Sequence, residues 1–172
     1  LIISIIEMGR AHSESKTKSV RVSKAWKNKQ ASARESKKPL GRACPYWLTL
    51  EDGAYKPISS RVDVIRKIFH MSSAGYGIRL IAKELNADKV PVFGSPVRNP
   101  SGSWGGSSVG KLLCNRALLG EYQPTGLMDN IRQNLGEPVK DFYPVIISEE
   151  EFLSAQAAMH SRKQSKSTKQ SI

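Results

Sequence analysis

The side chains best suited to chemistry in this sequence lie between Ser107 and Asn115. On a helix with about 100° per residue, Val109, Leu112 and Leu113 form one apolar stripe. The residues opposite this stripe are small, polar or basic: Ser107, Gly110, Lys111, Cys114 and Asn115. Lys111 and Asn115 can donate hydrogen bonds to bases or phosphates, and small neighbours permit close approach to a DNA groove. The alternative is an ordinary solvated helix that ends with Asn115 as its C-cap.

The charge of the chain favours the same kind of partner. It has 27 Lys and Arg against 15 Asp and Glu, a net charge of +12. Eleven basic residues and two acidic ones lie between Arg10 and Arg42, a local excess of +9. Such a balance predicts a polyanionic partner, and each phosphate neutralised should lower log affinity by about 0.9 per log unit of salt.

Several other classes of protein do not fit the sequence. Cys44 and Cys114 are far apart and form no metal spacing with the three histidines. We therefore expect no metal site, no disulfide framework and a reduced, cytoplasmic protein. Gly75-Tyr-Gly77 lacks the third glycine of a dinucleotide fingerprint, and no cofactor is predicted. The apolar start, residues 1–6, is too short to span a membrane, and the missing initiator Met suggests a fragment.

Three helices are needed to position the face that includes Lys111. Gly77 to Asn86 carries an apolar stripe of Ile78, Ile81, Ala82 and Leu85, and a serine before the second helix is a candidate N-cap. Two such short helices cannot fill a core alone. We expect them to pack on each other and on a helix between Ser60 and Gly75, in a helix-turn-helix arrangement.

Residues 1–35 read as one long, charged helix of about 50 Å, followed by a basic linker over residues 36–45. Lys24 and Lys27 on the helix, and Lys38 on the linker, are predicted DNA contacts. Pro39 ends any helix, and Gly41-Arg42 forms a flexible strap suited to a narrow minor groove. The alternatives are a solvated helix and a plain linker.

The long connection between Asn86 and Ser107 is a second candidate contact region. Loops of this length are usually functional or disordered, and Arg98 and Asn99 are predicted to meet phosphates. Trp104 is expected to pack at the base of the second helix rather than to stack on a nucleotide. Earlier, Trp47 and Tyr55 flank an Asp-Gly turn, which predicts a hairpin.

The predicted DNA-binding domain comprises residues 46–160. Its last part combines short strands with a helix. Residues 121–123 and 142–147 read as two strands, and Ser148 with Glu151 forms a capping box before a final helix. Residues 161–172 are low in apolar side chains and are predicted to be disordered. The expected fold class is α+β, mainly helical.

Three blocks of residues together resemble the recombinase domain of large serine recombinases. The first is Gly75-x-Gly-x-x-x-Ile-Ala-x-x-Leu-Asn86. The second comprises Trp104, Val109, Leu113, Asn115 and Gly120, and the third is Pro144-Val-Ile-Ile-Ser-Glu-Glu-Glu-Phe152. Upstream, Glu14 with Lys18-Ser-x-Arg-Val22 and Ala25-Trp26 is similar to the long helix that leaves the catalytic domain of that family.

The resemblance implies a bacterial or mobile-element enzyme that cuts and rejoins double-stranded DNA through a phosphoserine intermediate, in a tetramer that exchanges strands by rotation. The nucleophilic serine would precede Leu1, so these residues alone should be inactive. Arg21 would lie near the scissile phosphate in the intact enzyme, and Gly41-Arg42 would be the minor-groove strap. The first helix would form a homodimer or homotetramer. Many relatives carry a cysteine-rich zinc module at their far end, and residues 1–172 contain no such module.

Two other functions fit the same residues. One is a helix-turn-helix transcription regulator with no catalytic activity. The other is a basic RNA-binding or scaffolding protein whose residues 1–34 form a coiled coil.

Overall fold

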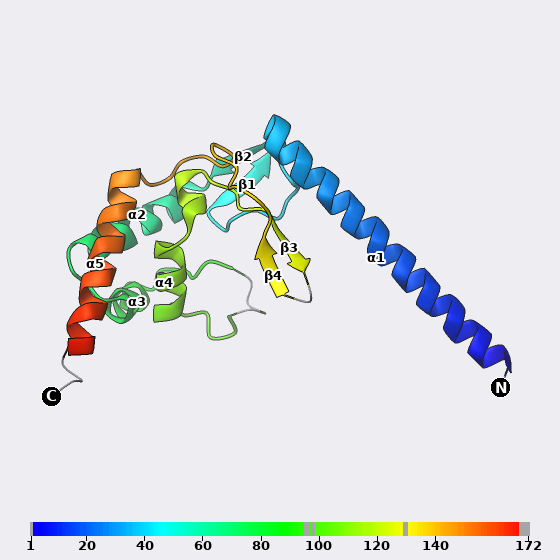
Figure 1. Cartoon of the computed structure of the whole chain (residues 1–172). Coiled ribbons are helices and arrows are strands. Elements are labelled where there is room, and N and C mark those ends of the chain that lie inside the picture. The colour runs from blue at the N-terminus through cyan, green and yellow to red at the C-terminus, as the bar shows by residue number, and fades with distance from the viewer. Residues whose placement is uncertain (1, 95–96, 98, 129–130, 169–172) are drawn as a thin grey trace. The chain divides into compact units, whose positions relative to one another are not determined.

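The computed structural model describes residues 2–94, 97, 99–128 and 131–168 (Figure 1). These residues form five α-helices, one short 3-10 helix and two antiparallel hairpins, which confirms the predicted α+β, mainly helical fold class. The chain divides into two compact units, Leu1–Leu40 and Gly41–Ile172.

The elements follow one another in a simple order. The first unit contains α1 (Ile2–Ser36). The second begins with β1 (Leu48–Glu51), β2 (Ala54–Pro57), α2 (Ser59–Ser73), α3 (Ile78–Ala87) and α4 (Gly106–Leu113). It continues with the 3-10 helix η1 (Arg116–Leu119), β3 (Thr125–Met128), β4 (Ile131–Asn134) and α5 (Glu149–Thr168).

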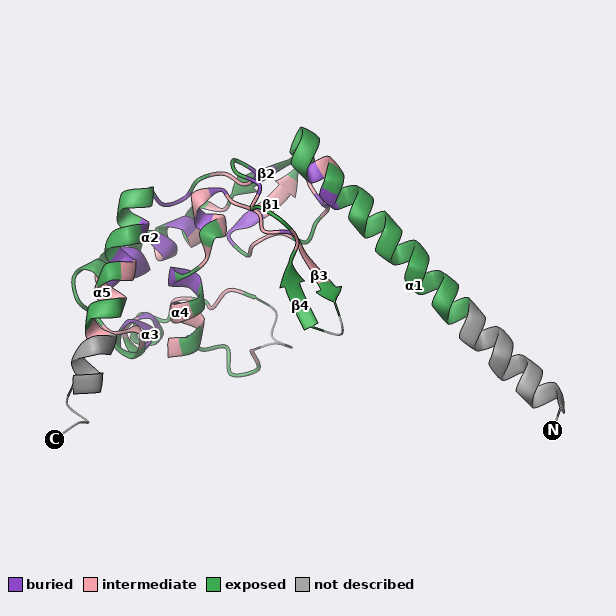
Figure 2. Ribbon diagram, in the orientation of Figure 1, coloured by how far each residue is buried: buried purple, intermediate pink, exposed green. Residues whose placement is uncertain are grey.

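The long helix predicted over residues 1–35 is confirmed as α1. Every described side chain from Glu14 to Lys29 is exposed, and burial begins only at Gln30 and Ala33 (Figure 2). Exposed Val22 and Trp26 lie one turn apart on this helix. Pairing of α1 with a second copy stays a prediction.

The core of the second unit lies among α2, α3, α4 and α5. As predicted, α3 packs on α4 and both contact α2, while α2 also packs along α5. The largest fully buried side chains include Ile65, Ile68, Ile81, Leu85 and Leu113. The short turn Ala74–Gly77 joins α2 to α3, whereas residues 88–105 join α3 to α4. A tight helix-turn-helix connection therefore lies between α2 and α3, with α4 added after a long loop.

The two hairpins agree with the sequence in one case and differ in the other. β1 pairs with β2 around Asp52-Gly53, as predicted, and both turn residues have positive φ angles, 51° and 75°. The prediction of strands over residues 121–123 and 142–147 is wrong. The second hairpin is formed by β3 and β4. Tyr122 forms only an isolated bridge with Val139.

Residues 142–147 contribute three buried side chains without forming a strand. Phe142, Ile146 and Ile147 are all core side chains. The amide of Phe142 donates to the Gly120 carbonyl at 2.8 Å, and that of Ile146 donates to the Leu118 carbonyl at 2.9 Å. Four amides of this segment donate to carbonyls of the turn after α4, which take the place of a partner strand.

The last helix, α5, begins at the predicted capping box. The Ser148 amide and hydroxyl both donate to Glu151 Oε2 at 2.9 Å, and the Glu151 amide donates to Ser148 Oγ at 3.2 Å. At its other end, Arg162 Nη1 donates to the Ser72 carbonyl at 3.1 Å. The backbone is helical to Thr168, so residues 161–168 differ from the predicted disordered tail.

Candidate nucleic-acid interface

The start of α4 is fixed by a two-hydrogen-bond contact between Asn86 and Trp104. Asn86 Nδ2 donates to the Trp104 carbonyl at 2.9 Å, and the Trp104 amide donates to Asn86 Oδ1 at 2.8 Å. The indole Nε1 donates to the Val90 carbonyl at 3.0 Å, and Trp104 is only 5% exposed. The prediction that Trp104 packs at the base of the second helix is confirmed.

The loop before α4 is attached to the domain through aromatic contacts. The rings of Phe93 and Trp104 meet edge to face, with centroids 5.0 Å apart. The Arg61 guanidinium lies 5.8 Å from the centre of the Phe93 ring and donates a hydrogen bond to the Tyr46 carbonyl. These contacts hold Phe93, near the beginning of the loop, and Trp104, at its end, against the domain.

Polar side chains between Asn99 and Ser103 bond to one another or to the backbone of this loop. Asn99 Nδ2 donates to the Ser103 carbonyl at 2.9 Å, and Ser101 Oγ donates to Asn99 Oδ1 at 2.8 Å. The Asn99 amide is thereby occupied within the loop. Arg98, the other predicted contact in this loop, lies outside the described residues.

The face of α4 opposite its core stripe is exposed in part, since Gly110 and Asn115 of the predicted set are half-buried and Gly110 lies close to Ile78 of α3. Ser107, Lys111 and Cys114 are exposed, while Val109 and Leu113 are fully buried. The N-cap is Gly105, which makes no side-chain bond, so Ser107 is a residue of the exposed face and not a cap. The structure therefore brings a hydroxyl and an ammonium group together on one solvated helix side.

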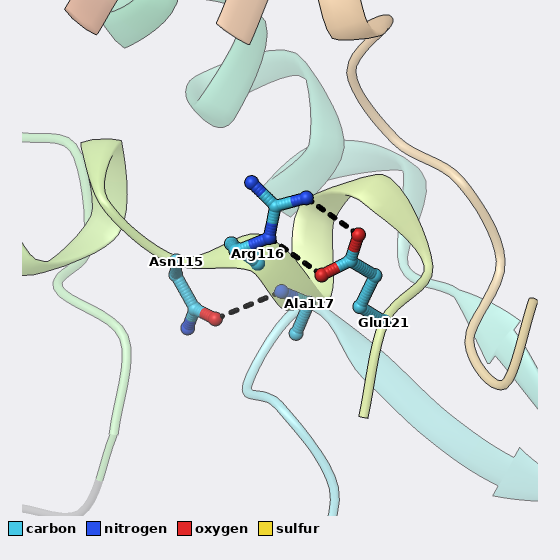
Figure 3. Close-up of polar contacts among 4 residues, drawn as sticks. All are labelled: Asn115, Arg116, Ala117 and Glu121. Carbon is cyan, nitrogen blue, oxygen red and sulfur yellow. Dashed lines mark hydrogen bonds and ion pairs between the residues drawn. The ribbon is translucent and has the colours of Figure 1, made fainter. Parts of the chain in front are cut away.

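Asn115, also predicted to lie on the exposed face of α4, is located after the end of that helix. The C-cap of α4 is Cys114, and the half-buried Asn115 instead caps η1, where its Oδ1 accepts from the Ala117 amide at 3.0 Å (Figure 3). Neither the C-cap alternative nor a fully free side chain is found. Half of the Asn115 amide group is engaged with the protein's own backbone.

An ion pair holds η1 in place immediately after α4. Arg116 Nε donates to Glu121 Oε2 at 2.5 Å and Nη2 donates to Oε1 at 2.6 Å, a bidentate arrangement (Figure 3). The Glu121 side chain is 11% exposed. The hydrogen bonds from the guanidinium lower the pKa of the Glu121 carboxyl.

The predicted strap is anchored at its glycine. The Tyr55 hydroxyl donates to the Gly41 carbonyl at 3.2 Å, and the φ of Gly41 is +138°, which L side chains rarely adopt. The Tyr55 ring lies 5.2 Å from that of Tyr143, so the anchor belongs to an aromatic cluster. Arg42 and Lys38 are exposed. The carbonyl of Gly41 is therefore held by the second unit, and the next residue, Arg42, is an exposed basic side chain.

The residues of α1 named in the sequence analysis are the predicted DNA contacts Lys24 and Lys27, and Arg21, which the resemblance places near the scissile phosphate. They recur every three residues, and all three side chains are exposed. They belong to the first unit, as does Lys38, whereas Gly41, Arg42 and the α4 residues belong to the second.

Sequence reasoning missed Arg79, an exposed residue of α3. A Cβ added at Gly106 would lie 3.3 Å from Arg79 Cγ, so this side chain borders the first turn of α4. The sequence contains one signal for this contact, the pair Gly106 and Gly110 on one side of α4. Small residues at this spacing let a neighbouring helix approach closely. Within the described part of the chain, no group of three or more His, Cys, Asp or Glu could hold a metal ion, and no helix could span a membrane.

Comparison with known proteins identifies similar chains. The family described as Recombinase matches residues 59–162. The uncharacterized protein YbcK of Escherichia coli (strain K12) is 35% identical over 158 residues, 91% of this chain and 30% of that protein. The structure described as "Crystal Structure of a LSR-DNA Complex" is similar with a TM-score of 0.50 and 17% identity, covering 76% of this chain and 36% of that one. The chain thus spans about a third of the length of each relative.

Proposed function

We propose, because this chain belongs to the recombinase family, that its second unit binds double-stranded DNA and presents the exposed face of α4 to the duplex. Within that family it is a recombinase domain of the large serine recombinase type. The observation that carries the proposal is the exposure of Ser107 and Lys111 on a helix whose start is fixed by Asn86 and Trp104. A rigid helix with a small basic face meets the steric and electrostatic needs of a groove.

The similar solved structure is a complex with DNA, and this supports the assignment of the partner. The net charge of +12 supports it independently, because a strongly basic surface attracts a polyanion at long range. Lys24, Lys27, Lys38, Gly41 and Arg42 are proposed as contacts that follow the phosphate backbone beside the site.

The intact protein, in this proposal, is a serine recombinase that cleaves and rejoins DNA through a phosphoserine intermediate. The nucleophilic serine belongs to a separate catalytic segment of that protein, and Arg21 assists near the scissile phosphate. The described residues provide site recognition, and α1 provides assembly into dimers or tetramers.

The test is a selection from a random-sequence duplex library with the full chain, followed by binding titrations on the enriched duplex across a salt series. Lys111→Ala should weaken binding and reduce the slope of log affinity against log salt by about 0.9, the value for one phosphate contact. Lys56→Ala is the matched control, because it removes the same charge where Lys56 is paired with Asp52 at 2.8 Å. Its slope should equal that of the wild type.

Two results would contradict the proposal. One is the absence of any duplex binding by the folded wild-type chain at low salt. The other is tighter binding to single-stranded RNA than to duplex DNA, which would favour the RNA-binding alternative. The chain could also bind a specific duplex while its natural protein has no resolvase-like catalytic segment. That result would favour the alternative function, a transcription regulator.

A further inference from the structure

The side chain of Arg79 lies along the first turn of α4, although Arg79 itself belongs to α3. A Cβ added at Gly106 would be 3.3 Å from Arg79 Cγ and 3.7 Å from Arg79 Cα. A contact of 3.3 Å is tighter than most real Cβ contacts, so a larger residue at position 106 would require Arg79 Cγ to shift by a few tenths of an ångström. One turn further along α4, a Cβ at Gly110 would be 3.7 Å from Ile78 Cδ1. The two glycines therefore let the beginning of α3 pack directly on α4.

This packing places Arg79 beside the exposed face of α4. Gly106 precedes Ser107 by one residue, and Lys111 is one turn further along the helix. The stem of Arg79 is thus fixed by a helix contact, while the residue as a whole remains exposed. A fixed stem reduces the rotamer freedom that the guanidinium loses on binding a ligand.

The guanidinium of Arg79 differs from those of several other arginines in the second unit. Arg61 donates to the Tyr46 carbonyl, Arg116 to Glu121 and Arg162 to Ser72. Arg79 forms no hydrogen bond or ion pair through its side chain with any residue that the structure describes. A positioned arginine with all five N–H donors available suits a phosphate group, which guanidinium can bind through two parallel hydrogen bonds.

We infer that Arg79 is a further DNA-contact residue, which binds a backbone phosphate beside the exposed face of α4, and that Gly106 determines its position. The inference rests on the proposed function and extends the DNA surface of the second unit from α4 to α3. Arg79 and the exposed face of α4 then have separate roles. The contact of Arg79 with a phosphate fixes the register of α4 on the duplex and does not itself read bases.

The experiment compares three substitutions on the duplex selected with the wild-type chain. Arg79→Ala should reduce the slope of log affinity against log salt by about 0.9, and Arg79→Lys should keep most of that slope because the charge remains. Arg66→Ala removes an arginine from the exposed side of α2 and should leave the slope unchanged. Each variant is first checked for wild-type circular dichroism and thermal unfolding.

A double-mutant cycle tests the role of Gly106. Gly106→Ala should weaken DNA binding in the wild-type chain, because the new methyl group displaces the Arg79 stem. It should have no further effect in the Arg79→Ala chain, where Cγ is absent. Additive effects of the two substitutions would overturn the positioning role.

The outcomes separate this inference from the function on which it rests. If the wild-type chain binds no duplex, the proposed function fails. If it binds and Lys111→Ala reduces the slope while Arg79→Ala does not, only the assignment of Arg79 is refuted. A loss of sequence preference with an unchanged salt slope would also refute it, because that result describes a base contact.

Discussion

Replacement of Asn86 by alanine should destabilise the second unit by about 2 kcal/mol. The substitution removes both hydrogen bonds to the Trp104 backbone, each with a net contribution of about 1 kcal/mol. It also leaves the partly buried N–H and C=O of Trp104 without those partners, which adds to the loss. Alanine favours the helix over asparagine by about 0.5 kcal/mol, which offsets part of it.

Urea denaturation followed by circular dichroism measures this effect. With an m-value of about 2 kcal/mol/M, the midpoint should fall by about 1 M. Lys83→Ala is the matched control, since Lys83 is exposed and lies one turn earlier on α3. Its free energy of unfolding should stay within about 0.5 kcal/mol of the wild type.

Asn86→Asp sharpens the same prediction. The carboxylate keeps the acceptor for the Trp104 amide but places a charged oxygen against the Trp104 carbonyl, so this variant should be destabilised at pH 7. Part of the loss should return below about pH 4, where the protonated acid regains a donor. Equal midpoints for Asn86→Ala and Lys83→Ala would show that the two hydrogen bonds do not hold α4.

Three further predictions concern stability. Ser148→Ala removes the hydroxyl of the capping box and should cost about 1 kcal/mol in thermal unfolding; an unchanged melting temperature would contradict this. Arg116 lowers the pKa of Glu121 in the folded state, so the stability from this pair is present above the ordinary glutamate pKa near 4.5 and is lost as the pH falls below it. Glu121→Gln should therefore show a smaller acid-induced drop in the urea midpoint than the wild type, and an equal drop would refute the role of the pair. Gly120→Ala should cost about 1–3 kcal/mol, because φ is +85° and the new Cβ would lie 2.8 Å from the Tyr143 carbonyl oxygen; a variant as stable as the wild type would show that the turn can relax.

The helices could be predicted because their signals are local. Ile81, Ala82 and Leu85 recur at helical spacing and are buried together in α3. The Ser148 capping box likewise depends on residues three positions apart, and the structure has its hydrogen bonds. Periodicity and capping are properties of a single turn, so they can be read without tertiary information.

The segments that differ from prediction depend on distant partners. An apolar run such as residues 142–147 looks the same whether its amides bond to a strand or, as in this fold, to the carbonyls of Leu118 and Gly120. Asn115 can end one helix or begin the next, and the choice depends on where the chain turns after Cys114. The contact of Arg79 with Gly106 arises only when α3 meets α4, so spacing along the chain could not reveal it.

The packing of α2 against α5 has a consequence for how the protein folds during synthesis. Phe69 meets Phe152 with ring centroids 6.0 Å apart, and Arg162 reaches Ser72 across 90 positions of sequence. During synthesis, the apolar side of α2 leaves the ribosome long before its partner exists. A nascent chain stalled before α5 should expose that surface and attract chaperones, and α3 and α4 would gain their final rigidity only when the last helix is released.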